Sequence, residues 1–247
     1  MNTYRIALDA GHYKNTPGKR CLKSIDPNET REWYLNSRIC DKIQSLLKDY
    51  NCEVLRLDDT TGNSEVTLEE RVKKSNSWKA DILVSVHHNA GINGGSGGGI
   101  VVFNSSKYPN NENERLKKLI YNGLIKYTGL KGNRSNPTPT GNLYIINYTK
   151  ATAVLCECGF MDSTVDTPII LTEEFADNAA KGIVEGIMEY SGIEKKTNPA
   201  DVPAEYAKDA WEWGIKNKLT TGERPLDGLT RQDFMLMLYK YHTNLGG

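Results

Sequence analysis

The segment DILVSVHHNA, residues 81–90, shows the architecture of the chain most clearly. Its first six residues form a nearly continuous apolar run, which is typical of a strand buried on both faces of a parallel sheet. Further strands are predicted at 4–9, 52–57, 100–103, 143–146 and 153–157, and helices at about 30–49, 67–78, 112–127 and 172–191. Strands that alternate with helices predict an α/β fold, with a twisted, mostly parallel sheet covered by helices on both faces.

A polar segment with two prolines, residues 193–203, follows the last of these helices and has the composition of a linker. Two more helical patterns lie beyond it. We therefore predict an α/β domain at 1–192 and a small C-terminal α-helical domain at 204–247.

The composition argues against several classes of function. The 247 residues carry 31 Lys and Arg against 31 Asp and Glu, so nothing electrostatic favours a nucleic acid or an anionic membrane as partner. No apolar run approaches the roughly 20 residues that span a bilayer, so no membrane insertion is expected. The first residues also lack the pattern of a signal peptide, and we expect a protein first held in the cytoplasm. The five cysteines contain no C-x-x-C pair, which predicts reduced, buried thiols.

Three of the predicted strands lead to a polar side chain that could do chemistry. The strand at 4–9 leads to His12, DILVSV leads to His87, and the strand at 153–157 ends at Glu157. In open α/β sheets, ligands bind beyond the carboxyl ends of the strands. We therefore expect these three side chains to lie together at one edge of the sheet.

The helix predicted at 30–49 adds a fourth group. Glu32 precedes Leu35 by three residues and Ile39 by seven, which places it on the apolar stripe of the helix. A carboxylate facing a core is costly unless it is paired or bound to a metal. Two histidines and a glutamate form the ligand set of several catalytic zinc sites, and Glu157 could then serve as the base.

Each of these residues also has an ordinary structural explanation. His12 could be a loop histidine satisfied by hydrogen bonds, Glu32 could favour the dipole of the first helical turn, and Glu157 could be a salt-bridge partner. Because His87 and His88 are adjacent at a strand end, one of them is expected to face away from any site. The convergence of all the groups on one edge is what favours a site.

Four segments resemble the signature segments of the zinc-dependent N-acetylmuramoyl-L-alanine amidases (the amidase-3 type), which include phage endolysins. They are LDAGH at 8–12, EWYLN at 32–36, VSVHHNA at 84–90 and ECGFM at 157–161. The resemblance covers roughly residues 3–190 and includes TLEERV at 67–72. It implies hydrolysis of the amide bond between N-acetylmuramic acid and L-alanine in peptidoglycan, and lysis of the bacterial cell.

Carried over to the matching positions, the resemblance implies that His12, Glu32 and His87 bind one zinc ion and that Glu157 is the catalytic carboxylate. Glu157 would take a proton from the attacking water and pass it to the departing L-alanine amine. His88 stands where the family commonly has a small residue, and His87 is the predicted ligand.

Three more polar residues are predicted as substrate contacts: Asn89, Arg134 and Asn142. For Arg134, a solvated loop charge is the more ordinary explanation. The cysteines on either side of Glu157 should point away from it by strand alternation, as small buried hydrophobes. This orientation argues against a cysteine protease.

The C-terminal segment resembles a single S-layer-homology repeat, through AWEWGIKNKLTTG at 210–222 and LTRQDFMLMLYKY at 229–241. Such modules normally come in threes, and only one copy is present. The resemblance implies attachment to a secondary wall polymer. Because roughly 44 residues bury little apolar surface alone, a homodimer formed through this domain is a second interpretation.

Two other functions remain open from the sequence. One is a zinc peptidoglycan peptidase that cuts within the stem peptide, and the other is a non-catalytic wall-binding protein. In each case the partner is peptidoglycan. We expect the protein to remain in the cytoplasm until a holin-type lesion or host lysis releases it, and then to act at the cell wall.

Overall fold

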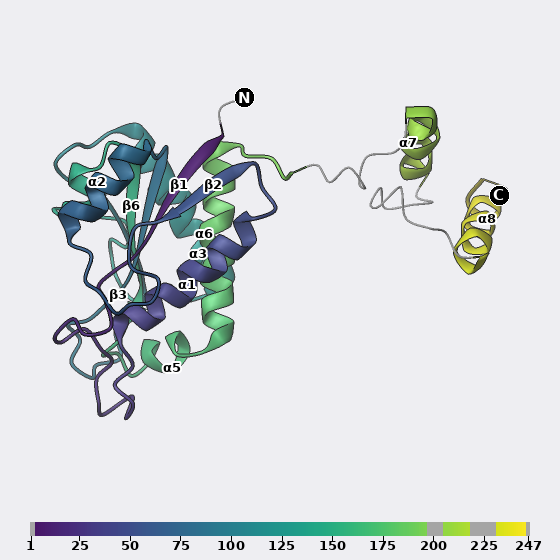
Figure 1. The fold of residues 1–247 in the computed structure, drawn as a ribbon. Helices are drawn as coiled ribbons and strands as arrows, with labels where there is room; N and C mark the ends of the chain where they lie inside the picture. Colours follow the sequence, from purple (N-terminus) through teal and green to yellow (C-terminus); the bar gives the residue numbers. More distant parts are fainter. Residues whose placement is uncertain (1–2, 197–204, 218–230, 246–247) are drawn as a thin grey trace. The chain divides into compact units, whose positions relative to one another are not determined.

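The computed structural model describes residues 3–196, 205–217 and 231–245. The chain divides into two compact units, Met1–Glu194 and Lys195–Gly247. The first unit is built on a six-stranded sheet with the strand order β2-β1-β3-β6-β4-β5 (Figure 1). Among the helices of the described residues, none combines the length and apolarity needed to cross a bilayer.

The strands are β1 (Tyr4–Ala10), β2 (Cys52–Arg56), β3 (Ile82–Asn89), β4 (Ile100–Ser105), β5 (Thr140–Gly141) and β6 (Thr152–Phe160). The helices of this unit are α1 (Glu32–Leu47), α2 (Leu68–Trp78), α3 (Asn111–Thr128), α4 (Tyr144–Tyr148), α5 (Asp166–Ile170) and α6 (Glu173–Ser191). β1 pairs in parallel with β2 and β3, and β3 pairs in parallel with β6. The predicted mostly parallel α/β sheet is confirmed, and β1, β3 and β6 end at the same edge.

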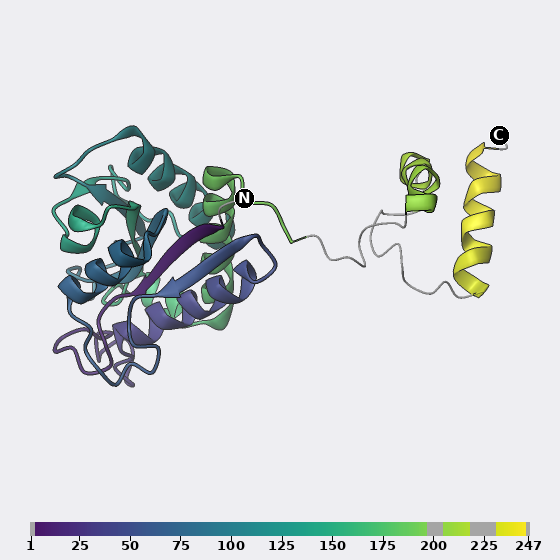
Figure 2. The same cartoon turned by 45° about the horizontal axis from the view of Figure 1, so that its top comes forward.

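Helices cover both faces of the sheet, as Figures 1 and 2 show for α1 and α6 on one side and α2 on the other. On the first face, apolar side chains of α1, α3 and α6 pack against Ile6, Leu8, Val84 and Val86. On the second face, Val72 of α2 and Ile145 and Ile146 of α4 pack against Ala7 and Leu83. The central strand β3 is therefore buried on both sides from Ile82 to Val86, which explains its apolar run.

The start of α2 follows the spacing seen in the sequence. Thr67 accepts a hydrogen bond from the backbone N–H of Glu70, at 3.2 Å, and the Glu70 carboxylate accepts one from the N–H of Thr67, at 2.8 Å. This reciprocal capping box satisfies two donors that a helix end otherwise leaves free. It begins α2 at Leu68, close to the predicted start.

One detail of the sheet differs from the sequence prediction, and a second was left open by it. The short strand predicted at 143–146 is wrong, because these residues enter α4, where the N–H of Asn147 bonds to the carbonyl of Leu143 at 3.0 Å. A short apolar run does not separate a strand from a buried helical turn. In addition, β4 runs antiparallel to β6. A parallel return would need a crossover of about a dozen residues or more, and the loop from Asn89 to Ile100 is shorter than that.

The second unit is helical where it is described. It contains a short 3-10 turn, η2 (Glu205–Ala207), and the helices α7 (Lys208–Lys216) and α8 (Arg231–Leu245). These fall on the two helical patterns of the sequence. Most of the predicted linker at 193–203 lies outside the described residues.

The crossing of α3 and α6 predicts a sensitive position. A Cβ atom on Gly123 would lie 2.2 Å from the carbonyl oxygen of Gly182, so the two backbones are in direct contact there. Gly123→Ala must push the helices apart, and we expect it to lower the free energy of unfolding by about 1–3 kcal/mol, although alanine favours a helix. Denaturant unfolding measures this. The control is Lys118→Ala on the solvent side of α3, and equal stability of the two variants would contradict the close contact.

Candidate functional site

Three side chains from three different elements meet beyond the carboxyl ends of β1 and β3. His12 follows β1, Glu32 begins α1 and His87 belongs to β3, and one ligand atom of each lies within 4.8 Å of the others. Glu32 Oε2 is 3.3 Å from His12 Nε2, and Glu32 Oε1 is 3.0 Å from His87 Nδ1. The structure thus brings together the three residues that the sequence suggests as metal ligands. We call them the His12–Glu32–His87 cluster.

The cluster has the properties of a cation site. Glu32 is 0% exposed, yet its Oε2 and His12 Nε2 are buried without a hydrogen-bond partner among the described residues. Burial raises the pKa of Glu32, but the neighbouring imidazoles of His12 and His87 outweigh this effect and hold the pKa well below its usual value. An ionised, buried and incompletely bonded carboxylate is unfavourable on its own. A divalent cation would complete its contacts, and a carboxylate with two imidazoles is a zinc ligand set.

A buried arginine holds the turn that presents His12. The backbone of His12 is left-handed, with φ of 67°, which is uncommon for a residue with a side chain. The guanidinium of Arg71, from α2, donates to the carbonyl oxygens of Ala10 and His12 at 2.7 and 2.8 Å and to the Asp9 carboxylate at 2.5 Å. Ser85 donates to the other oxygen of Asp9 at 2.6 Å. This network holds the backbone of the turn and thereby fixes the position of His12.

Arg71 was not among the residues that the sequence pointed to. A signal was nevertheless present, because Arg71 lies beside Val72 and four residues before Ser75 on the buried face of α2. An arginine on such a face needs buried acceptors, and here the acceptors belong to the turn that leads to His12.

The ring of His87 rests directly on a glycine. A Cβ atom on Gly11 would lie 2.0 Å from His87 Cε1, and the N–H of Gly11 bonds to the carbonyl of Val86 at 3.0 Å. No other residue leaves room for the imidazole at this place. The glycine in LDAGH is therefore needed because the side chain of His87, on the neighbouring strand β3, occupies the space where a Cβ atom would lie.

His88 points away from the cluster. Its Nδ1 lies 2.8 Å from the side-chain oxygen of Asn36, whose amide nitrogen in turn donates to the carbonyl of Gly11 at 3.1 Å. Burial lowers the pKa of His88 to about 3, so its ring is neutral. Its backbone N–H donates to Glu32 Oε1 at 3.2 Å. Of the two adjacent histidines, His87 belongs to the cluster and His88 supports it.

Glu157 lies next to the cluster, opposite His87 in the pairing of β3 with β6. Burial raises its pKa to about 7, while the charges of His87 and Lys19 act in the opposite direction. Its Oε2 is buried and has no hydrogen-bond partner among the described residues. A carboxyl group with a pKa near neutrality can both accept and release a proton at neutral pH.

Lys19 is a further charged group at this site. Its ammonium is 3.6 Å from Glu32 Oε2, and its carbonyl accepts the backbone N–H of Glu32 at 3.0 Å. Lys19 lies in the long loop before α1, which has no periodic pattern that would have singled out one lysine.

Two of the three predicted substrate contacts lie at the same edge of the sheet as the cluster. Asn89 ends β3, and its side-chain oxygen accepts the N–H of Ala90 at 2.8 Å. The guanidinium of Arg134 lies 4.6 Å from the ring centre of Phe160, the last residue of β6. Both side chains can therefore meet a substrate that extends beyond the cluster.

Asn142 does not lie at this edge. It follows β5, which pairs with the last residues of β4, and β4 is antiparallel to β6. The loop after β4 therefore leads to the opposite edge of the sheet, where Asn142 accepts a hydrogen bond from Asn147 at 2.8 Å. This placement gives no support to the predicted substrate contact of Asn142.

The cysteines take no part in the site. All five are free thiols, and four of them are buried. Cys156 and Cys158 belong to the apolar cluster on the α1 side of the sheet, on the face away from Glu157. The prediction of free, buried thiols is confirmed for four of the five cysteines, and Cys52 is partly exposed.

Comparisons with known proteins agree on one family. The sequence model of the family described as N-acetylmuramoyl-L-alanine amidase matches residues 6–189. The endolysin of Bacillus phage SPP1 is 29% identical over 198 residues, which cover 78% of this chain and 68% of the endolysin. The sporulation-specific N-acetylmuramoyl-L-alanine amidase of Bacillus subtilis (strain 168) is 25% identical over 196 residues, 78% of this chain and 71% of that protein. The crystal structure of an N-acetylmuramoyl-L-alanine amidase from Clostridium difficile 630 matches with a TM-score of 0.68 and 27% identity, over 77% of this chain and 97% of the other.

The contact between Gly11 and His87 predicts a variant that harms metal binding without touching a ligand. In Gly11→Ala the added methyl group must displace the imidazole of His87, and we expect the affinity for a divalent metal ion to fall about 10–100-fold. Competition with a chelating dye measures the affinity, with circular dichroism as the check of folding. His88→Ala is the control and should keep one metal ion per chain. Unchanged affinity in Gly11→Ala would show that His87 is no ligand.

Proposed function

The chain belongs to the Amidase-3 family of N-acetylmuramoyl-L-alanine amidases, and we propose that it hydrolyses the amide bond between N-acetylmuramic acid and L-alanine with a zinc ion held by His12, Glu32 and His87. The observation that carries the zinc proposal is the cluster itself, a fully buried carboxylate between two imidazoles with bonding atoms left over. Glu157 beside it supplies the second carboxylate that the chemistry needs.

Each protein group has a distinct part in the proposed mechanism. Zinc, when bound, supplies a Lewis acid that lowers the pKa of water and polarises the scissile carbonyl. Glu157 accepts the proton of the attacking water and then delivers it to the departing L-alanine amine. Its pKa near 7 makes both proton states accessible, and a cation nearby favours the ionised state before the attack. Asn89 and Arg134 orient the substrate at the edge of the sheet.

Two alternatives from the sequence fit these observations less well. A peptidoglycan peptidase could use the same cluster, but the amidases named above are similar to this chain over about three quarters of its length. A wall-binding protein would have no need of a buried carboxyl with a raised pKa next to a cation site. We therefore propose an amidase that acts at the cell wall. The similarity to a phage endolysin supports a role in lysis.

For the second unit we propose one of two roles. It either attaches the protein to the wall through a secondary wall polymer or pairs two chains into a homodimer. The support is the large number of apolar side chains that α8 leaves exposed. They include Phe234, Met235, Leu236, Leu238, Tyr239 and Tyr241.

Product analysis distinguishes these functions. Purified peptidoglycan treated with the protein should release stem peptides with free L-alanine amino termini, as seen by mass spectrometry. A chelator should abolish the release, and added Zn²⁺ should restore it, because the side chains of the site do not activate water strongly by themselves. Cuts within the stem would indicate a peptidase, and an absence of products would indicate a binding protein.

The proposed division of labour between the two glutamates predicts opposite outcomes for two matched variants. Glu157→Gln should keep the fold and one zinc ion per chain, but its kcat should fall at least about 10²–10⁴-fold, because an amide accepts no proton. Glu32→Gln should lose zinc affinity, since a neutral amide is a poor ligand. Elemental analysis and kcat are measured in parallel. Zinc lost from Glu157→Gln and retained in Glu32→Gln would mean that the two residues have exchanged roles.

A further inference from the structure

The backbone of Lys19 holds this residue at the open side of the cluster. Its carbonyl oxygen accepts the N–H of Glu32 at 3.0 Å, and the N–H of Cys21 donates to the carbonyl of Thr30 at 2.9 Å. An antiparallel bridge joins the residues between these two bonds, and the side chain of Cys21 is buried in the core. Residues 19–21 are thus paired with the start of α1, and Lys19 has a fixed place beside Glu32.

The side chain of Lys19 carries a charge whose hydrogen-bond donors are unused. Its ammonium is 3.6 Å from Glu32 Oε2, which is close enough for an ion pair but too far for a hydrogen bond. Glu32 Oε2 accordingly has no hydrogen-bond partner within the described part of the chain. The Lys19 side chain is 45% exposed. Its three N–H groups are therefore available to a ligand that enters from the open side.

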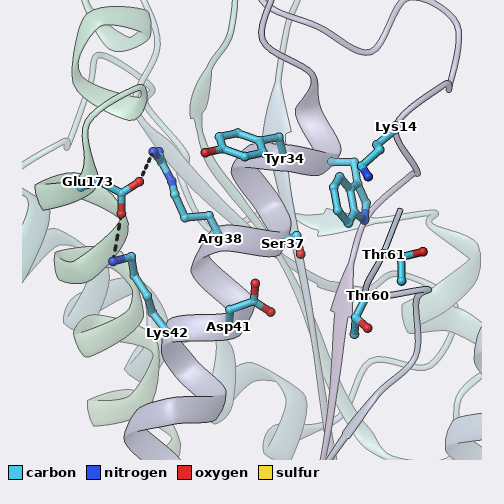
Figure 3. Close-up of a pocket in the computed structure, with 10 residues that line it drawn as sticks. Lys14, Tyr34, Ser37, Arg38, Asp41, Lys42, Thr60, Thr61 and Glu173 are labelled. Carbon is cyan, nitrogen blue, oxygen red and sulfur yellow. Dashed lines mark hydrogen bonds and ion pairs between the residues drawn. The ribbon is translucent and has the colours of Figure 1, made fainter. Parts of the chain in front are cut away.

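Two other lysines near α1 have partners outside the cluster. Lys42 forms an ion pair with Glu173 at 3.0 Å, which Figure 3 shows as a contact between two helices. Lys14 lines the same pocket, and its ammonium lies 5.2 Å from the ring centre of Trp33. These two charges serve the packing of the fold, whereas the charge of Lys19 is directed to the cluster.

Lys19 acts on both carboxylates of the proposed reaction. Its ammonium lies beside Glu32, and its positive charge also reaches Glu157, where it opposes the rise in pKa that burial causes. On the proposed mechanism Glu157 takes the proton of the attacking water, so the attacked carbonyl carbon must lie near Glu157 and the cluster. The oxygen bonded to that carbon then comes within reach of the flexible Lys19 side chain.

We propose that Lys19 is a further catalytic residue, whose ammonium donates a hydrogen bond to the oxygen of the scissile carbonyl as water attacks. The new carbon–oxygen bond forms while the π electron pair of the carbonyl moves onto its oxygen, and the water proton goes to Glu157. When that pair returns, the carbon–nitrogen bond breaks and the proton passes from Glu157 to the departing amine. A positive charge placed in advance beside the developing negative charge lowers the barrier to both steps. The identity of this oxygen rests on the proposed function, whereas the binding of an oxyanion beside Lys19 does not.

Lys19→Met in the full chain tests the assignment, because methionine keeps an unbranched stem and removes the charge. We expect one zinc ion per chain, an unchanged circular dichroism spectrum and a little-changed KM, with kcat lower by about 10–100-fold because an oxyanion donor is lost. Lys19→Arg should recover part of this loss, since it keeps the charge and the donors. Lys23→Met is the control and should keep the kcat, because Lys23 belongs to the same loop but is 76% exposed and lies 3.9 Å from Glu29.

Binding of inorganic phosphate to the zinc-loaded protein gives a second measurement that needs no turnover. Calorimetry should show that Lys19→Met binds this oxyanion at least about tenfold more weakly than the unchanged chain, and that Lys23→Met binds it equally well. If phosphate binding depends on Lys19 but the unchanged chain releases no L-alanine amino termini, the amidase proposal fails and the oxyanion position at Lys19 is supported. The Lys19 proposal is overturned if Lys19→Met loses zinc, if it keeps the kcat of an active unchanged chain, or if it binds phosphate as tightly as the unchanged chain does.

Discussion

The burial of the Glu32 carboxylate is the constraint on which the rest of the site depends. A charge that is 0% exposed must be compensated locally, because the interior screens it poorly. The compensation comes from His12, His87 and the backbone N–H of His88, together with Lys19 at the open side. These groups belong to different elements, so the position of α1 against the sheet and the site itself are set by the same contacts.

Further groups around the cluster hold its side chains in fixed positions. The Arg71 guanidinium replaces water for the carbonyls of the turn at His12, and Asp9 balances its charge in the core. Removal of one partner of such a buried pair leaves the other charge uncompensated, so the pair commits the turn to one conformation. Gly11 acts on the other side by leaving the space that His87 fills. Two members of the cluster are thus held in place by groups outside it.

The sequence allowed the sheet, its parallel core and the His12–Glu32–His87 cluster to be predicted, because strand ends and apolar periodicity carry that information directly. It did not show the direction of β4, which depends on the length of a loop, nor the edge of the sheet at which Asn142 lies. Arg71 and Lys19 were missed for another reason. The only signal for Arg71 is its place on the buried face of α2, and Lys19 lies in a loop without a periodic pattern. Their partners, backbone carbonyls and a carboxylate on other elements, cannot be read from the local sequence.

The helix α1 places its buried polar groups on one side only. Its inner side carries Glu32 and Asn36 towards the sheet, while Trp33, Ser37 and Asp41 lie on its outer side. Contacts that a substrate makes away from the scissile bond serve to orient that bond at the cluster, which is more effective than tighter binding of the reacting group itself.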